Sequence, residues 1–234
     1  MVAHYLDAFT GRGVRIAVID SGVHASHPHV GGVAGGLALG EDGTIVDEFV
    51  DGLGHGTAVT AVIREKAPDA EIVVVKVFWE TLATSPATLV RAIHEAVAHR
   101  TRLVNLSLGT TDTRCREALA EAIAHARACG ALIVAAADDN GVRWLPGSLD
   151  GVAPVVLDWS CPREAYRLIE QGERTVLATS GYPRDIPGVP CERNMKGISF
   201  AVANATGFAA RALEARPDAG LVELVDLLRA SSGG

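Results

Sequence analysis

The stretch Gly197-Ile198-Ser199-Phe200-Ala201 begins a long apolar, alanine-rich run near the end of the chain. A small residue before a serine, followed by a run typical of a buried helix over 199–215, places the serine hydroxyl at the start of that helix. The N–H groups and the dipole of a helix N-terminus favour negative charge, so this is a place where an oxyanion can form. By itself, however, the stretch favours simple capping of the helix over catalysis, because serine is a common N-cap residue.

Two stretches upstream also place reactive side chains at the ends of predicted elements. Asp20 follows the apolar, β-rich run 14–19, so it lies at the end of a predicted buried strand, where open α/β sheets bind ligands. The alternative for Asp20 is a turn cap. His55, in Gly54-His55-Gly56-Thr57, lies in the first turn of a helix predicted over 55–66. There the helix dipole keeps an imidazole neutral near pH 7, as a general base requires; the alternative is a packed histidine at a crowded turn.

Strands and helices alternate along the rest of the chain. Apolar, β-rich runs predict further strands at 71–78, 103–108, 132–137 and 152–157, and periodic apolar residues predict further helices from Ser85-Pro86, over 113–129 and over 221–228. The alternation predicts an α/β fold with three α/β/α layers and a mostly parallel central sheet. No linker or repeat interrupts it, so residues 1–234 are expected to form a single compact domain. The glycine-rich segment 31–40 is expected to be a loose loop, and 158–171 to be helical.

Composition narrows the classes of partner. The net charge of −7 comes from interspersed residues of both signs, so neither nucleic acid nor an anionic membrane is an expected partner. No apolar run approaches the roughly 20 residues of a spanning helix, and the chain begins without a cationic and then apolar leader. We therefore expect a cytoplasmic protein without a signal peptide or pro-segment. The cysteines have no zinc-knuckle spacing and are expected to be free thiols: Cys115, Cys129, Cys161 and Cys191.

Taken together, the three polar stretches resemble the signature stretches of the subtilisin-like serine peptidases, the subtilases. Asp20-Ser21-Gly22 follows a strand, whereas Gly54-His55-Gly56-Thr57 and Gly197-Ile198-Ser199-Phe200-Ala201 begin helices. The order Asp, His, Ser along the chain is that of the subtilisins. The resemblance runs from about Tyr5 to Arg229, nearly the whole chain, and it implies the subtilisin-like version of the α/β/α fold.

The resemblance also implies roles for individual residues of a hydrolase. Ser199 would be the nucleophile of a serine endopeptidase, His55 its general base, and Asp20 the group that orients the imidazole, with peptide bonds cut through an acyl-enzyme. The backbone N–H of Ser199 would be one oxyanion donor. Ser107-Leu108-Gly109 would form the edge on which an extended substrate lies as an added strand, and Ala136-Ala137 would complete the substrate-binding residues.

One departure from the family pattern concerns the second oxyanion donor. The family carries an asparagine where this chain has Asp139, and Asn140 follows one position later. An ionised Asp139 would repel an oxyanion, a protonated Asp139 would donate to it, and a shift of the loop by one residue would present Asn140 instead. In subtilisin, loss of this donor costs about 100- to 1000-fold in turnover, so the departure predicts a slower enzyme.

Two functions from different classes therefore remain open. The first is a processing peptidase that acts inside the cell on an extended segment of a peptide or protein substrate, such as a ribosomal precursor peptide. The alternative is a pseudo-protease or peptide-binding protein with an impaired oxyanion hole. Acidic residues near the predicted cleft (Asp51, Asp138 and Asp139) weakly favour a Lys or Arg beside the scissile bond.

No cofactor is expected to be required. The closely spaced His24, His27 and His29 are expected to be turn and loop residues, because no acidic or thiol ligand nearby completes a metal set. Structural calcium is compatible with the resemblance, but the acidic segment 41–51 does not have the spacing of a known calcium loop, so no calcium site is assigned.

Overall fold

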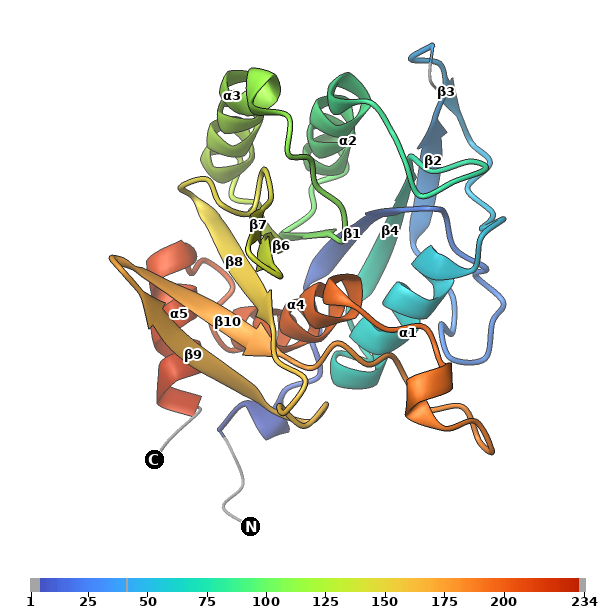
Figure 1. Cartoon of the computed structure of the whole chain (residues 1–234). Helices are drawn as coiled ribbons and strands as arrows, with labels where there is room; N and C mark the ends of the chain where they lie inside the picture. The colour runs from blue at the N-terminus through green and yellow to red at the C-terminus, as the bar shows by residue number, and fades with distance from the viewer. Residues whose placement is uncertain (1–4, 41, 232–234) are drawn as a thin grey trace.

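A largely parallel sheet runs through the middle of the computed structural model, which describes residues 5–40 and 42–231 (Figure 1). Its strands are β1 (Arg15–Asp20), β2 (Gly35–Leu39), β3 (Ile45–Val46), β4 (Glu71–Lys76), β5 (Leu103–Leu106), β6 (Leu132–Asp139), β7 (Val142–Arg143), β8 (Val152–Leu157), β9 (Tyr166–Gln171) and β10 (Arg174–Thr179). They lie in the order β3-β2-β4-β1-β5-β6-β8-β10-β9, with β7 paired to β6. Neighbours from β2 to β10 are parallel, whereas β3, β7 and β9 pair antiparallel. The prediction of a mostly parallel sheet is confirmed. The leaderless start predicted at Met1 lies outside the described residues.

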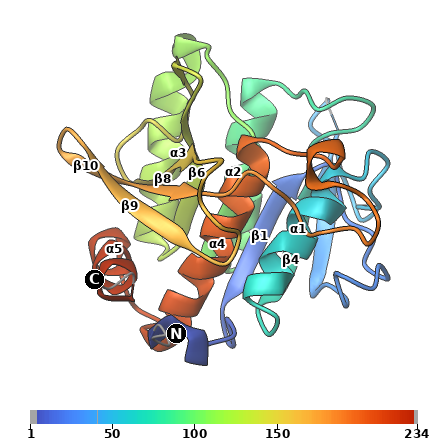
Figure 2. The ribbon, with the colours of Figure 1, turned by 60° about the horizontal axis from the view of Figure 1, so that its bottom comes forward.

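Helices cover both faces of the sheet. They are α1 (His55–Lys66), α2 (Pro86–Ala98), α3 (Arg116–Ala128), α4 (Ile198–Ala215) and α5 (Leu221–Ser231), with short 3-10 turns at Tyr5–Ala8, Thr113–Cys115 and Cys191–Arg193. Helices α2 and α3 pack on one face, and α1, α4 and α5 lie on the other (Figures 1 and 2). Each face has its own cluster of buried apolar side chains. The predicted α/β/α layers are therefore confirmed.

Helix α4 holds the centre of its layer because most of its residues are small and buried. It packs against α1 and against β5, β6, β8 and β10. A Cβ atom at Gly207 would lie 2.5 Å from Cβ of Lys66, so the glycine is what lets α1 and α4 approach so closely. The start of α4, which carries Ser199, is thereby fixed beside the start of α1, which carries His55.

For two segments, the structure differs from the predicted secondary structure. Residues 31–40, expected to be a loop, contain β2, and residues 158–171, expected to be helical, contain β9. A Cβ atom at Gly36 would lie 2.6 Å from the carbonyl oxygen of Val74, so glycine here permits close packing of two strands. Strand β9 forms an antiparallel hairpin with β10, with Gly172 in a left-handed conformation (φ 63°) at the turn. Both predictions were wrong because pairing with another strand outweighs local preference.

The order of the strands determines where the functional residues meet. Strand β1 lies between β4 and β5, and the chain leaves it toward β2 and β4 before it crosses back to β5. The carboxyl ends of strands at such a reversal frame a crevice. Asp20 is the last residue of β1, and Ser107 directly follows β5.

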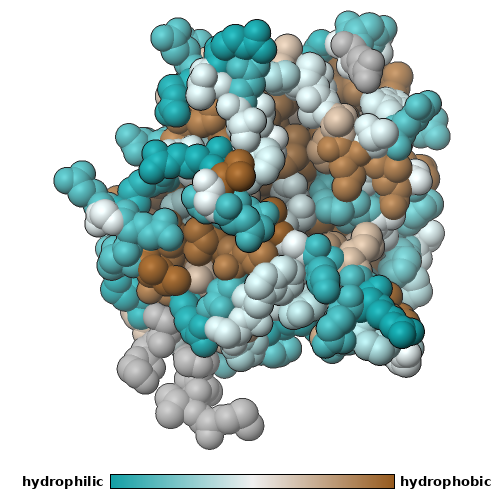
Figure 3. Space-filling view, viewed as in Figure 1, coloured by the Kyte–Doolittle hydropathy of each residue, from teal (hydrophilic) through white to brown (hydrophobic). Residues whose placement is uncertain are grey.

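The outer surface is mixed in character. On the face seen in Figure 3, apolar side chains form separate patches among hydrophilic ones. This agrees with the interspersed charges of the sequence. Within the described part of the chain, no helix is long and apolar enough to cross a membrane.

Candidate active site

Asp20 and His55 lie together although 35 positions separate them in the chain. Oδ1 of Asp20 lies 2.8 Å from Nδ1 of His55 and also accepts a hydrogen bond of 2.7 Å from the backbone N–H of Ser21. Asp20 is completely buried. A Cβ atom at Gly56 would lie 2.2 Å from the carbonyl oxygen of Gly22 and 3.1 Å from Oδ1 of Asp20, so the glycine after His55 is needed for the close approach.

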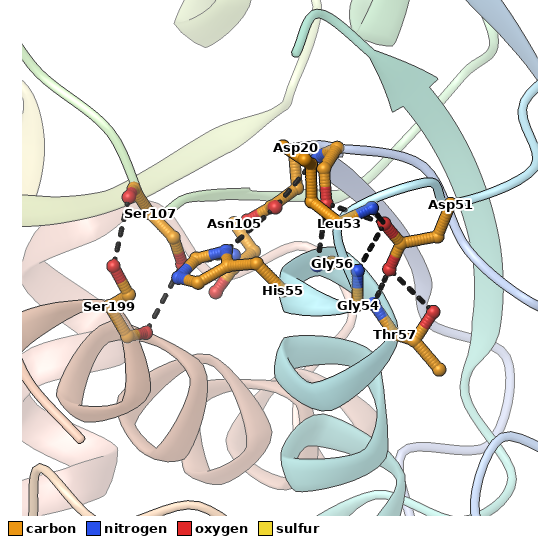
Figure 4. Close-up of polar contacts among 11 residues, drawn as sticks. Asp20, Asp51, Leu53, Gly54, His55, Gly56, Thr57, Asn105, Ser107 and Ser199 are labelled. Atoms are coloured by element: carbon orange, nitrogen blue, oxygen red, sulfur yellow. Dashed lines mark hydrogen bonds and ion pairs between the residues drawn. The ribbon is translucent and has the colours of Figure 1, made fainter. Parts of the chain in front are cut away.

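Asp51 fastens the start of α1 to the segment that follows β1. Its Oδ1 accepts hydrogen bonds from the Ser21 hydroxyl (2.9 Å) and from the N–H groups of Leu53 (2.9 Å) and Gly54 (2.8 Å). Its Oδ2 accepts from the N–H (2.9 Å) and the hydroxyl (2.6 Å) of Thr57. The side chain is therefore a buried cap at the start of α1 (Figure 4), and the preference for a basic substrate residue that it was taken to favour stays a prediction.

The environment of His55 favours its charged form. Burial lowers the pKa of His55, but the hydrogen bond and the charge of Asp20, together with the charge of Asp51, outweigh burial and raise the pKa above its ordinary value. The helix dipole, on which the sequence prediction relied, disfavours the imidazolium, whereas the two nearby carboxylates favour it. The ring of Phe200 packs beside the imidazole, with 5.7 Å between the ring centroids.

Ser199 lies in the first turn of α4, on the other side of the His55 ring from Asp20 (Figure 4). Its Oγ donates a hydrogen bond of 3.2 Å to the carbonyl oxygen of Ser107, and the Ser107 hydroxyl donates one of 3.1 Å to the carbonyl oxygen of Ser199. Asn105 extends this network, since its Nδ2 donates to the Ser107 hydroxyl (2.9 Å) and its Oδ1 accepts from the Thr206 hydroxyl (2.9 Å). Asn105 escaped the sequence analysis, although a polar residue inside an apolar strand was a usable signal.

A cavity of about 230 Å³ lies beside Ser199 and His55. Ser107, Leu108, Gly109 and Ala136 line it, as residues predicted to bind substrate should, whereas Ala137 is buried and does not line it. The remaining lining residues are Phe78, Leu82, Trp144, Ile198 and Val202. None of the lining residues is acidic.

The two predicted oxyanion residues lie in a hairpin. Strand β6 continues through Asp139, and β7 returns after Asn140 (φ 52°) and Gly141 (φ 77°). Nδ2 of Asn140 donates to Oδ1 of Asp139 at 3.1 Å, and neither residue lines the cavity beside Ser199. The Asn-Gly pair is the strongest short-range hairpin signal and was the clue to this turn. The oxyanion role of Asp139 or Asn140 stays a prediction.

The three early histidines lie in turns and irregular segments, as predicted, and they lie close together. His24, His27 and His29 line a second cavity, of about 410 Å³, with residues from the start of α1 and from the segment before α4. No group of three or more His, Cys, Asp or Glu side chains in the described residues is placed to hold a metal ion.

Comparison with known proteins identifies a family to which this chain is similar. A model of the subtilase family, peptidase S8, matches residues 11–183, which include Asp20 and His55 and end before Ser199. Subtilisin E of Bacillus subtilis (strain 168) is 28% identical over 221 residues, 88% of this chain and 55% of its own length. The minor extracellular protease Epr of the same organism is 34% identical over 141 residues, 56% of this chain and 21% of its own. The chain thus spans about half of subtilisin E and less of Epr.

Solved structures share the fold. A cold-adapted subtilisin-like serine proteinase superposes with a TM-score of 0.70 at 20% identity, over 93% of this chain and 81% of its own. A lanthipeptide protease gives 0.70 at 20% identity, over 93% and 80%. The prenylagaramide maturation protease PagA gives 0.68 at 24% identity, over 91% and 80%.

Proposed function

Because this chain belongs to the subtilase family, we propose that it is a serine endopeptidase whose catalytic residues are Asp20, His55 and Ser199. The single observation that carries the proposal is the contact of buried Asp20 Oδ1 with His55 Nδ1, 2.8 Å apart, beside a serine that lines the same cavity as the histidine. A histidine oriented by a carboxylate beside a serine hydroxyl is the arrangement that activates a serine nucleophile.

The proposed steps follow from the hydrogen bonds. With Nδ1–H of His55 donated to Asp20, Nε2 is left as the base that takes the Ser199 proton when Oγ attacks the peptide carbonyl carbon. The same Nε2–H then protonates the leaving amine, and water releases the acyl group from Ser199. The carboxylates of Asp20 and Asp51, which raise the pKa of His55, stabilise the imidazolium that exists between these two proton transfers. The backbone N–H of Ser199 supplies one oxyanion donor, with Asp139 or Asn140 as the candidate for the second.

We propose an extended segment of a precursor peptide as the substrate, cut inside the cell. The Ser107-Leu108-Gly109 edge beside Ser199 suits a peptide that is added as a strand, which requires an unfolded segment. Two proteins of the same fold carry a peptide substrate or a maturation role in their names, a lanthipeptide protease and the prenylagaramide maturation protease PagA. Both features favour a dedicated processing enzyme over a general scavenger.

A second candidate function, a pseudo-protease that binds a peptide without cutting it, is favoured by two contacts. The Ser199 hydroxyl donates to the Ser107 carbonyl oxygen, so it must turn before it can transfer its proton to His55. In addition, the segment that would carry the oxyanion amide is folded into the Asp139–Val142 hairpin. Both contacts would suit a site that binds an extended peptide without cleaving it.

Labelling with a fluorophosphonate serine-hydrolase probe, read by intact mass, separates the two candidates. We expect one adduct on the wild type and none on Ser199→Ala or His55→Ala. A folded wild-type protein that forms no adduct at any pH from 6 to 9 would favour the peptide-binding candidate. Digestion of casein beside a panel of short peptides then tests the substrate class, because a processing enzyme leaves most of the casein intact.

A further inference from the structure

We infer that Trp144 determines which substrate side chain the cavity beside Ser199 accepts. The accepted residue, which carries the attacked carbonyl group, is uncharged and its size is limited by the indole, whereas Lys and Arg side chains are excluded. This inference rests on the proposed function, because it concerns the substrate of that same site. It replaces the weak expectation of a basic residue beside the scissile bond.

Trp144 is fixed in place by its backbone. Its N–H donates to the carbonyl oxygen of Ala137 (3.0 Å), and its own carbonyl oxygen accepts from the N–H of Ser148 (2.9 Å). The next residue, Leu145, exchanges two hydrogen bonds of 2.8 and 2.9 Å with Thr110. These bonds tie the segment on one side to β6 and on the other side to the chain that follows the substrate edge. The backbone of Trp144, and with it the Cβ atom that carries the indole, is therefore held beside the cavity.

The substrate edge is shaped to receive the indole. A Cβ atom at Gly109 would lie 3.3 Å from Cβ and 3.5 Å from Cε3 of Trp144, and 2.7 Å from the carbonyl oxygen of Leu145. Glycine at 109 is required mainly by the Leu145 carbonyl oxygen, and it also leaves room for Trp144 to lie against the edge. The indole Nε1 is out of contact with solvent and has no hydrogen-bond partner in the described chain, so it does not face the open cavity. The cavity is therefore bounded by the carbon atoms of the ring.

The size and the chemistry of the cavity then select the side chain. Its volume of about 230 Å³ is below the roughly 300–1,000 Å³ of small-molecule pockets, so it suits a single side chain. A lysine or arginine head buried there would find no carboxylate, since Asp51 is used as a helix cap and Asp138 accepts from the N–H of Gly141 in the hairpin. Loss of the indole would widen the cavity, so phenylalanine and tyrosine side chains should gain more than leucine from a smaller residue at position 144.

Trp144 is also a residue lining the cavity that can be replaced without creating a void in the hydrophobic core. Phe78 is 4% exposed and Val202 is completely buried, so trimming either of them hollows the interior. Trp144 is half-buried and lies in a connection between strands. Its size is therefore free to determine specificity.

The test is to profile a peptide library by mass spectrometry with the wild type, Trp144→Phe and Trp144→Ala. We expect the wild type to cut after residues such as Ala, Val or Leu. Trp144→Ala should raise kcat/KM for Phe or Tyr at this position, relative to Leu, at least tenfold, and Trp144→Phe should lie between the two. The matched control is Trp159→Ala, which removes an indole that is 49% exposed and does not line the cavity; its profile should equal that of the wild type.

A labelled and correctly folded Trp144→Ala protein with the wild-type profile would overturn the inference and leave the proposed function intact. A wild type that prefers Lys or Arg would do the same. If no protein is labelled or cuts any peptide, the proposed function fails, and calorimetry on peptides that end in Leu or Phe decides about Trp144. Stronger binding of the Phe peptide by Trp144→Ala than by the wild type would support the inference, and equal binding would refute it.

Discussion

Replacing Asp51 with alanine is expected to loosen the side of the active site that carries His55. The carboxylate is 3% exposed and accepts five hydrogen bonds, two from hydroxyl groups and three from backbone N–H groups. The hydroxyl groups can turn to other acceptors, whereas the N–H groups of Leu53, Gly54 and Thr57 are fixed. An unsatisfied buried donor costs about 1–3 kcal/mol, and contributions that share one acceptor are not additive, so the free energy of unfolding should fall by about 3–5 kcal/mol.

Asp51→Asn separates the charge from the hydrogen bonds. Its amide oxygen keeps up to three of the contacts while its NH₂ group faces other donors, so the loss should be about 1–3 kcal/mol. The substitution also removes one of the charges that raise the pKa of His55, and that pKa therefore falls. Because the base form of His55 then persists to lower pH, the acid limb of the labelling profile moves to lower pH.

Urea unfolding at pH 7 measures the first effect, and the rate of fluorophosphonate labelling against pH measures the second. Asp47→Asn is the control, because this exposed carboxylate belongs to the same acidic segment and caps nothing. It should change neither quantity. An Asp51→Ala protein that unfolds at the wild-type urea concentration, or an Asp51→Asn profile that moves to higher pH, would refute the reasoning.

Three further changes test other parts of the structure. Gly56→Ala would place a methyl group 2.2 Å from a backbone oxygen and should abolish labelling, whereas Gly52→Ala, whose nearest neighbour lies at 3.9 Å, should retain it. Burial raises the pKa of Tyr166 to about 12 from 10.0, so the wild type should lose stability as the pH rises between these values, and Tyr166→Phe should lose less in urea unfolding. Asp139→Asn should increase peptidase activity if residue 139 serves the oxyanion, while Asn140→Asp, which keeps a residue that suits the turn, should leave activity unchanged; activity of Asp139→Asn at or below wild type at every pH would remove that assignment.

The central elements of the fold could be predicted because their signals are local. The strand predicted at 152–157 coincides with β8, and the helix predicted to begin at His55 is α1. Apolar runs that are buried on both sides leave a clear pattern in the sequence. The two wrongly predicted segments, β2 and β9, owe their conformation to pairing with other strands. The glycines of β2 are typical of a loop in the sequence, and their role in packing against Val74 of β4 is visible only in the structure.

The candidate site was predictable to a similar extent and for the same reason. Asp20, His55 and Ser199 each lie at the end of an element that short stretches identify, so their types and order are visible in the sequence. The role of Asp51 depends on how a loop folds back over the start of α1. The buried Asn105 network depends on the packing of α4 against β5. The first arrangement has no local pattern from which it can be read, and for the second the sequence shows only a polar residue inside an apolar strand.

The hairpin after β6 links the speed of the proposed reaction to its specificity. Asp139, the candidate oxyanion residue, pairs with Val142 across the Asn140-Gly141 turn, and the returning strand leads directly to Trp144. The N–H of Trp144 closes the base of the hairpin on the carbonyl oxygen of Ala137, next to Ala136 in the cavity. A change in the length of the turn would therefore displace the indole wall and the oxyanion candidate together. Substitutions that keep the Asn-Gly turn leave each residue free to be tested separately, which is why single side-chain changes at 139 and 144 can distinguish rate from specificity.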